Sequence, residues 1–238
     1  MRTREKLLEK FVLFLNNVRF VESPLLVERI KHGNVYFSQT GEDIILNMLF
    51  TKKDGFYVDV GCHHPTRFSN TLLLYRRGWH GINIDADYRN MREFENARKR
   101  DINLNLAVSD TEEVLPLNLF DESAVSTFSS NWAKRMSRAY KSSPRKVLMR
   151  TTTLAKTLDK YLPKNTRIDF LNIDVEGYDF KVLRSNNWEK YRPSYVLIEM
   201  FDSPSGSKRN KSIDSYLRKR GYEFLAKTLF SAVYKKIR

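Results

Sequence analysis

The chain has 238 residues, enough for one domain with a well-buried core and a short appendage. Its 42 Lys and Arg outnumber 28 Asp and Glu, and the net charge of +14 favours anionic partners: nucleic acid, anionic lipid headgroups, or phosphorylated and acidic substrates. The single cysteine, Cys62, excludes an intrachain disulfide and a zinc site built from several cysteines.

The opening segment "MRTREKLLEKFVLFLNNV" predicts a basic amphipathic helix, because its apolar residues keep helical spacing. Such a helix packs on the domain or makes a peripheral contact with a membrane surface, and most stripes of this kind are core faces. The segment lacks the features of a signal peptide, and no stretch is apolar enough to cross a bilayer, so we expect a cytoplasmic protein. We assign residues 1–35 to a helical extension and 36–238 to the main domain.

A polar loop then leads into a helix within "YFSQTGEDIILNMLF", with Glu42 and Asp43 in its first turn, and from residue 56 strands and helices alternate. The predicted strands are "FYVDV" (56–60), "GINID" (81–85), "INLNLAV" (102–108), "IDFLNIDV" (168–175) and "SYVLIEM" (194–200). The predicted helices are "SNTLLLYRRG" (69–78), "YRNMREFENARKR" (88–100), "TLAKTLDKYL" (153–162), "DFKVLRSN" (179–186) and "SIDSYLRKRG" (212–221). "VLPLNLF" (114–120) is an extra strand, residues 121–145 are a polar, Ser-rich break, "DSPSGSKRN" (202–210) is a loop, and "YEFLAKTLFSAVYKKI" (222–237) is a hairpin of two strands.

This alternation predicts an α/β fold with a doubly wound parallel sheet, whose ligands bind beyond the carboxyl ends of the strands. Polar residues gather at those ends. The strand-end residues, mostly polar, are Asp59, Gly61, His63 and His64 after the first strand; Asp85 and Asp87; Ala107, Ser109 and Asp110; Asp174 and Glu176; and Glu199. Because unpaired buried charges are costly, acids and histidines collected at one sheet edge indicate a site.

The segments "VDVGCHH", "GINIDAD" and "FLNIDVEGYD", together with the terminal hairpin, resemble the FkbM-type branch of class I S-adenosylmethionine-dependent methyltransferases. The resemblance covers residues 36 to about 234, including "SQTGED". It implies a Rossmann-like sheet of seven strands, mostly parallel with a C-terminal antiparallel hairpin, and bound S-adenosylmethionine. It also implies methylation of a hydroxyl, often on a sugar or a natural-product scaffold. One departure is "HHP", where many members carry Asn near the position of His63 and Gly at that of Pro65.

Cofactor contacts are predicted around the first two strand ends. Gly61 allows close approach of the backbone, and Asp85 is placed to accept hydrogen bonds from both ribose hydroxyls. For Asp59 and Gly61 the alternative is an ordinary strand-to-helix turn, and Ser69 and Asn70 also suit helix caps. The full predicted set is Gln39, Glu42, Asp59, Gly61, His63, Ser69, Asn70, Asp85, Ala86, Ala107 and Asp174.

Methyl transfer is an in-line displacement that needs an aligned acceptor oxygen and removal of its proton. We predict Asp174 as the first candidate base, Glu176 as the second and His64 as the third. The alternatives for the two acids are a helix cap or ligation of a divalent metal, Mg²⁺ or Mn²⁺, for which Asp174, Glu176 and Glu199 are the candidates. A metal shared by the two adjacent histidines is not expected, and Cys62 is interpreted as packed in its turn.

The resemblance implies a sugar, glycan or sugar-linked acceptor. If the basic segments "RAYKSSPRK" and "SGSKRN" flank the acceptor cleft, they favour phosphate-bearing or acidic acceptors. One rival class is a nucleic-acid-binding or RNA-modifying protein, because "NWAKRMSRAYKSSPRKVLMR" mixes basic and aromatic residues; a basic segment is more often a solvated face, so nucleic acid is not the expected partner. The other rival is a membrane-surface adaptor anchored by the first helix. The oligomeric state is left open.

Overall fold

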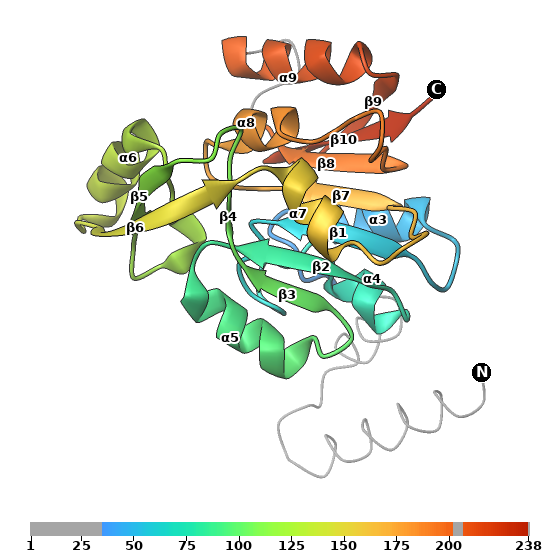
Figure 1. Ribbon diagram of the computed structural model, residues 1–238, viewed down its shortest axis with the longest axis horizontal. Helices are drawn as coiled ribbons and strands as arrows, with labels where there is room; N and C mark the ends of the chain where they lie inside the picture. Colours follow the sequence, from blue (N-terminus) through green and yellow to red (C-terminus); the bar gives the residue numbers. More distant parts are fainter. Residues whose placement is uncertain (1–34, 202–206, 238) are drawn as a thin grey trace, which may run out of the picture. The chain divides into compact units, whose positions relative to one another are not determined.

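The computed structural model describes residues 35–201 and 207–237, and residues 37–238 form one compact unit (Figure 1). The helix predicted within the first 35 residues lies outside the described residues, and the boundary between extension and main domain stays a prediction. Among the described residues, no helix has the length and apolar character needed to cross a membrane.

The main sheet has seven strands in the order β3-β2-β1-β7-β8-β10-β9. The strands are β1 (Phe56–Val60), β2 (His80–Asp85), β3 (Ile102–Asn105), β7 (Phe170–Ile173), β8 (Tyr195–Glu199), β9 (Tyr222–Lys227) and β10 (Ser231–Lys236). The first five are mutually parallel, and β10 runs antiparallel to both β8 and β9. The predicted Rossmann-like sheet with its antiparallel C-terminal hairpin is therefore confirmed, and the strand order reverses between β1 and β7.

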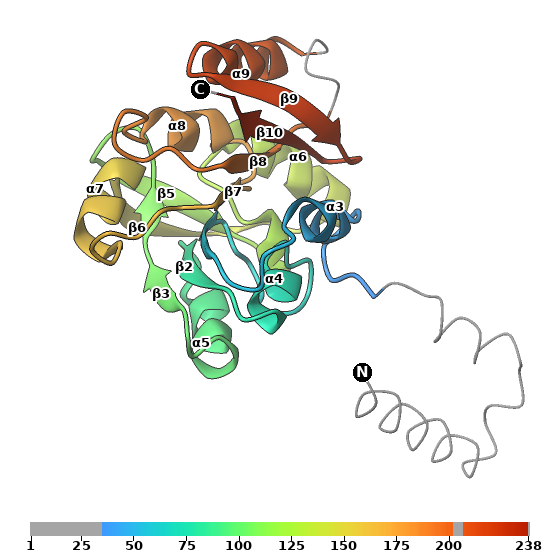
Figure 2. The ribbon, with the colours of Figure 1, turned by 90° about the vertical axis from the view of Figure 1, so that its right-hand side faces the viewer.

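Helices cover both faces of this sheet (Figures 1 and 2). On one face lie α3 (Glu42–Leu49), α4 (Leu72–Arg76) and α5 (Tyr88–Ala97); on the other lie α7 (Leu154–Tyr161), α8 (Asp179–Arg184) and α9 (Lys208–Arg218). Successive side chains of β1 point to opposite faces of the sheet, so this strand contributes to the hydrophobic core on each face. Tyr57 packs with Leu46 of α3, whereas Val58 packs with Leu154 of α7 and Val182 of α8.

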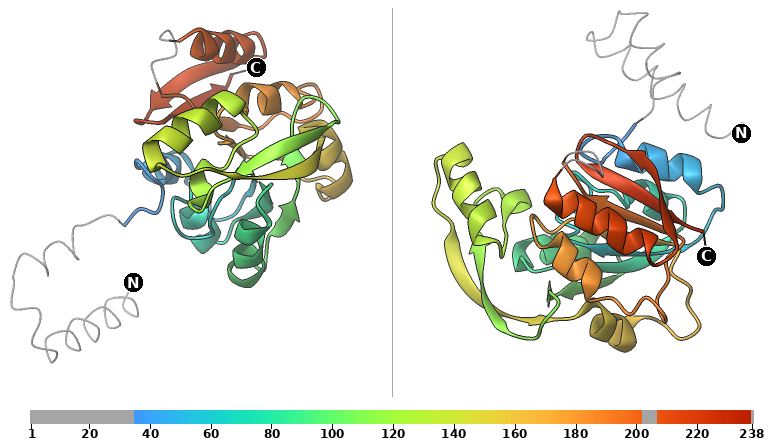
Figure 3. Two further views of the ribbon diagram at one scale, coloured as in Figure 1. Left: turned by 90° about the vertical axis from the view of Figure 1, so that its left-hand side faces the viewer. Right: turned by 90° about the horizontal axis from the view of Figure 1, so that it is seen from above.

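A second, three-stranded sheet stands beside the main one (Figure 3). In it β6 (Arg145–Thr152) pairs antiparallel with β5 (Val114–Leu119) and parallel with the short β4 (Ala107–Val108). The connection between β5 and β6 holds η1 (Ser123–Val125) and α6 (Ser130–Tyr140), neither of which the sequence predicted. Ser129 caps α6 by accepting from the Trp132 N–H at 3.2 Å, and Ala133 and Met136 pack under it in a small core of their own.

Strand register brings the predicted strand-end residues into one row. Val60 is paired with Ile84 on one side and Ile173 on the other, and Ile173 is paired with Ile198. The next residues along these strands are Gly61, Asp85, Asp174 and Glu199. The structure therefore places the polar residues of four strands at one edge of the sheet.

Candidate functional site

Two adjoining hollows, of about 590 and 560 Å³, open along this row; together they are called the strand-end cleft. Both are lined by Gly61, His63, Ala124, Asp174 and Glu176. The first extends toward Asp85 and Ala86, and the second toward Gln39, Glu42, Asp59 and Asn70. Because they share these five residues, the two hollows form one continuous cleft along the strand ends.

Gly61 brings the turn after β1 against the turn after β7. Its φ of +81° is in the left-handed region, and a Cβ built there would lie 1.7 Å from the carbonyl oxygen of Asp174. Its N–H donates to the carbonyl of Ile84 at 2.8 Å, which ties the same turn to β2. Only glycine fits a backbone packed this closely, so the residue type follows directly from the geometry.

Asp85 is half-buried, with its carboxyl group beneath the turn. One carboxylate oxygen accepts the His63 N–H at 3.0 Å and the other accepts the Asp87 N–H at 2.7 Å. Burial raises the pKa of Asp85 to about 7, although the two amides favour its ionised form. Asp87 itself caps α5 by accepting the Arg89 N–H at 3.0 Å, so this acid has a structural role.

The two histidines have different environments. His63 has a φ of +53° and lines both hollows, and its Nδ1 lies 3.3 Å from the Ser123 hydroxyl. Burial, helped by the charge of Arg67, lowers the pKa of His63 to about 4, so the ring is neutral near pH 7. His64 lines neither hollow, and its Nδ1 accepts the backbone N–H groups of Thr66 and Arg67 at 3.1 and 2.9 Å.

Three other predicted cofactor residues have mainly structural contacts. Asp59 is 1% exposed, and its carboxylate accepts from Thr71 at 2.9 Å and from Asn172 at 2.7 Å, which joins β1 to β7. The Ser69 hydroxyl accepts the N–H of Leu72, the first residue of α4, at 3.2 Å, and Ser69 lines neither hollow. Ala107 is buried away from the cleft, and its neighbours Leu106 and Val108 line it instead, because adjacent residues of an extended chain face opposite ways.

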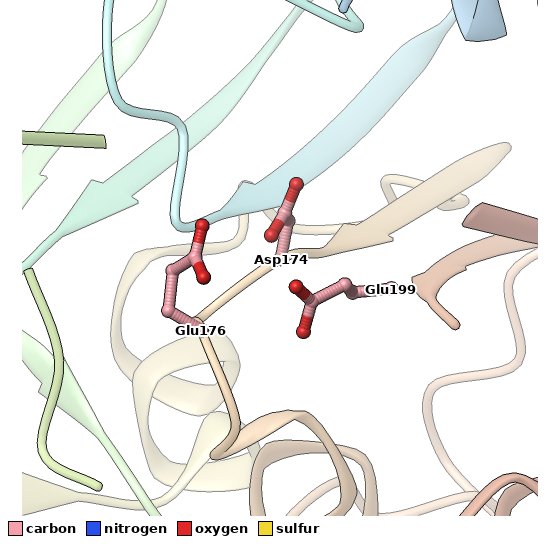
Figure 4. Close-up of side chains that lie close together, drawn as sticks. All are labelled: Asp174, Glu176 and Glu199. Carbon is pink, nitrogen blue, oxygen red and sulfur yellow. The ribbon is translucent and has the colours of Figure 1, made fainter. Parts of the chain in front are cut away.

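Asp174, Glu176 and Glu199 form an acid centre at the end of β7 and β8 (Figure 4). One carboxylate oxygen of each lies within 4.8 Å of the others. Glu176 has a φ of +53°, which turns the chain back so that its side chain faces the same space as that of Asp174. Among the described residues, Glu176 Oε2 is buried without a hydrogen-bond partner, a rare state for a carboxylate that a bound ligand would relieve.

Burial raises the pKa values of all three acids of the centre. Burial and, second to it, the charge of Asp179 together raise the pKa of Asp174 to about 8. Burial also raises the pKa of Glu176 well above its usual value, as does the charge of Asp174. The Trp132 indole offsets part of the Glu176 shift, although its N–H does not reach hydrogen-bond geometry. In the protein alone, the centre therefore holds protons near neutral pH.

Arg209 and Asp179 support the acid centre from behind. Asp179 accepts the N–H groups of Val175 and Gly177 at 2.9 and 3.0 Å, which fixes the turn that carries Glu176. Arg209, at the start of α9, forms ion pairs with Asp179 and, at 2.9 Å, with Glu199. One acid of the centre is thus already paired with a fixed cation.

The sequence did not predict the contribution of the loop after β5. Ser123, Ala124, Ser126, Thr127 and Phe128 all line the first hollow. Thr127 donates its hydroxyl to the carbonyl of Glu176 at 2.7 Å, and Glu122 accepts two bonds from Arg67 at 3.0 and 2.7 Å. These contacts close the loop over the cleft. The only sequence signal was the interruption of the alternating pattern at residue 121.

The sequence profile described as the Methyltransferase FkbM domain matches residues 59–224, which is most of the chain and includes the end of β1, all of β2 and β7, and the acid centre. The chain belongs to the FkbM methyltransferase family. It is therefore an S-adenosylmethionine-dependent methyltransferase, as the resemblance of its motifs predicted. No curated protein matches this FkbM domain significantly in sequence.

Two solved methyltransferase structures are similar to this chain at low sequence identity. A TehB-like S-adenosylmethionine-dependent methyltransferase from Corynebacterium glutamicum has 10% identity and a TM-score of 0.44, over 89% of this chain and 94% of that one. The C-terminal domain of precorrin-6Y C5,15-methyltransferase from Rhodobacter capsulatus has 9% identity and a TM-score of 0.43, over 83% and 88%. Likeness at this level says nothing about the acceptor.

The residues of the strand-end cleft suit S-adenosylmethionine. Gly61 lets the turn after β1 pack directly on the backbone of Asp174 beside both hollows, Asp85 offers carboxylate oxygens next to the first hollow, and Glu176 presents an unpartnered carboxylate oxygen. A carboxylate has about four lone-pair positions, so Asp85 can hold its two amides and still accept from two hydroxyls. The cofactor, when bound, supplies a methyl group already activated by a sulfonium.

Proposed function

We propose that the protein is an O-methyltransferase that acts on a hydroxyl of a sugar, a glycan or a sugar-linked intermediate. The observation that carries the proposal is the acid centre: Asp174 and Glu176 line both hollows of the strand-end cleft and have raised pKa values. A buried carboxyl with a raised pKa is a stronger base once ionised than an exposed one, which suits the deprotonation of an alcohol.

The residues divide into three tasks. Gly61 and Asp85 hold the cofactor, Asp174 and Glu176 orient the acceptor hydroxyl and take its proton, and Asp179 with Arg209 keeps the acids in place. The positive charge of a sulfonium bound beside Asp174 and Glu176 would lower their pKa values. The base therefore ionises when the cofactor binds. We give Asp174 the first role and Glu176 the second. His64 is the weakest candidate because backbone amides already use its Nδ1.

A divalent cation at Asp174, Glu176 and Glu199 is the alternative use of the same acids. Carboxylate oxygens suit Mg²⁺ and Mn²⁺, and the three acids are near enough to share one ion. The ion pair between Arg209 and Glu199 argues against it, because a cation would have to compete with a charge already fixed there. In that alternative the acids ligate a metal that polarises the hydroxyl.

The experiment is transfer of labelled methyl from S-adenosylmethionine to a panel of sugars, sugar phosphates, nucleotide sugars, oligosaccharides and RNA. Transfer to a saccharide hydroxyl is the expected result, and phosphate-bearing acceptors are expected to lose binding as salt is raised. RNA tests the rival interpretation of the basic segment, which α6 and β6 carry. Transfer to RNA alone, or to no hydroxyl in the panel, would contradict the proposal.

A further inference from the structure

A third hollow, of about 770 Å³, lies beside the acid centre between α6 and the start of α9; we call it the α6 hollow. It is lined by Ser129, Asn131, Trp132, Arg135, Gly177, Phe201, Ser207, Arg209 and Asn210. Gly177 directly follows Glu176, and a Cβ at Gly177 would lie 3.4 Å from that of Ser129. The hollow therefore begins one residue from Glu176, the second candidate base.

Aromatic rings join the α6 hollow to the strand-end cleft. The ring centroids of Trp132 and Phe201 are 5.4 Å apart, and those of Phe201 and Phe230 are 5.5 Å apart. Phe230 lines the second hollow of the cleft. Such a wall gives the apolar C–H face of a sugar ring a surface to pack on, while the ring's hydroxyls remain free for polar partners.

The Trp132 side chain also carries an unused donor. Among the described residues, its indole N–H is buried without a hydrogen-bond partner, and so is Glu176 Oε2 beside it. Native proteins rarely leave buried donors and acceptors unpaired. Because Trp132 lines the α6 hollow and Glu176 lines the strand-end cleft, this pair of unsatisfied groups lies at the boundary between the two.

Arg135 gives the hollow a positive charge. Its guanidinium lies 5.1 Å from the centroid of Trp132, on the exposed side of α6. Within residues 35–201 and 207–237, no ion pair engages Arg135, whereas Arg209 on the opposite wall is paired with Asp179 and Glu199. A guanidinium left unneutralised suits a phosphate or carboxylate, with which it forms paired hydrogen bonds.

We propose that the α6 hollow is the acceptor site, that its Trp132–Phe201 wall packs against a sugar ring, and that Arg135 binds an anionic group on that sugar. The proposal rests on the proposed function, and it names the substrate class as an anionic sugar. Arg135 is then a specificity residue: it selects the acceptor and takes no part in proton transfer.

The test is binding without turnover, in the presence of S-adenosylhomocysteine, with glucose 6-phosphate, glucuronate and uncharged glucose as probes. Trp132 fluorescence reports occupancy, because the other two tryptophans, Trp79 and Trp188, are buried in the domain core. A Trp132→Phe variant identifies the signal, and calorimetry measures affinity independently. We expect one or both anionic sugars to quench the wild-type fluorescence and to bind at least tenfold more tightly than glucose.

Two matched variants of α6 decide the matter. Arg135→Gln should weaken the anionic probes roughly ten- to hundredfold, the loss expected for charge-assisted hydrogen bonds, and should leave glucose unchanged. Arg138→Gln removes the same charge one turn away, outside the hollow, and should bind all probes as the wild type does. Equal losses in both variants, or none in Arg135→Gln, would overturn the proposal.

Calorimetry with S-adenosylmethionine alone separates this proposal from the proposed function. Absence of cofactor binding would contradict the methyl-transfer proposal, while probe binding still decides the acceptor site. Failure of any anionic sugar to bind a protein that does bind S-adenosylmethionine would overturn the acceptor site alone. The ratio of glucose 6-phosphate to glucuronate affinity then identifies which anionic group the site prefers.

Discussion

Asp85 allows cofactor recognition to be tested through its protonation. With a pKa of about 7, the buried carboxyl is about half ionised at pH 7 in the protein alone. Ribose hydroxyls that donate to Asp85 favour its ionised form, so cofactor binding should expel a proton. If only the ionised form binds well, the fraction available is about one in a hundred at pH 5, and affinity should rise roughly 100-fold from there to pH 8.

Asp85→Asn removes this titration while keeping the size of the side chain. At pH 8 it should weaken S-adenosylmethionine by about 1.5–3 kcal/mol per lost charge-assisted hydrogen bond, or roughly ten- to 150-fold. The slope of the logarithm of cofactor affinity against pH should also decrease by about one in this variant, because one titrating group is removed. Asp159→Asn is the matched control, since this acid is exposed and its contacts are with Lys190 and Tyr191, far from the cleft lining.

The assay is calorimetric titration from pH 5 to 8.5, in buffers of different ionisation enthalpy so that released protons are counted. Wild type and Asp159→Asn should share one slope of affinity against pH, and Asp85→Asn should be flatter. If all three slopes coincide, Asp85 does not couple cofactor binding to proton release, and the assignment of the ribose to this acid is refuted.

Asp174→Asn should lose most of the turnover at saturating cofactor while retaining cofactor affinity, and His64→Ala should lose less; near-normal turnover in Asp174→Asn would exclude it as the base. Asp174→Asn should also change the pH dependence of stability. Because folding raises the pKa of Asp174 from 3.8 to about 8, the cofactor-free wild type loses stability as pH rises between these values. The melting temperature of the variant should therefore fall less between pH 5 and 8 than that of the wild type. Chelators should leave activity intact if the acids act as proposed, and a loss that Mg²⁺ or Mn²⁺ restores would make them metal ligands. Gly61→Ala should lower the free energy of unfolding, measured by denaturant titration, by about 3 kcal/mol or more. Gly41→Ala is the control: its φ is +87°, but no atom lies within 4 Å of its Cβ position, so it should lose about 1 kcal/mol. Similar losses in the two variants would show that backbone conformation, and not the contact with Asp174, causes the destabilisation.

The part of the site that lies on strand ends was predictable from sequence. Strands that alternate with helices run parallel, and parallel strands end at one edge, so Gly61, Asp85, Asp174 and Glu199 had to meet. The sequence motifs identified the residue types, and the strand register places these residues next to one another. This follows from chain geometry and needs no knowledge of side-chain contacts.

Features set by single-residue orientation were not predictable. The left-handed conformation of His63 turns its ring into the cleft and leaves His64 outside, and no pattern in "GCHHP" distinguishes the two. A one-residue offset likewise exchanged Ala107 for its neighbours Leu106 and Val108. The helix α6 was missed because its apolar face has few members, among them Ala133 and Met136, within a run of Ser, Lys and Arg.

The segment from β5 to β6 has a core of its own, built on Phe120, Val125, Ala133 and Met136, and this core is separate from those beneath the main sheet. Within the second sheet, β6 pairs with the short strand β4, which follows β3 of the main sheet along the chain. Substitutions that reshape its surface therefore leave the packing under Gly61 and Asp85 undisturbed. The residues that cover the cleft can therefore change without loss of the packing that holds the strand ends in register.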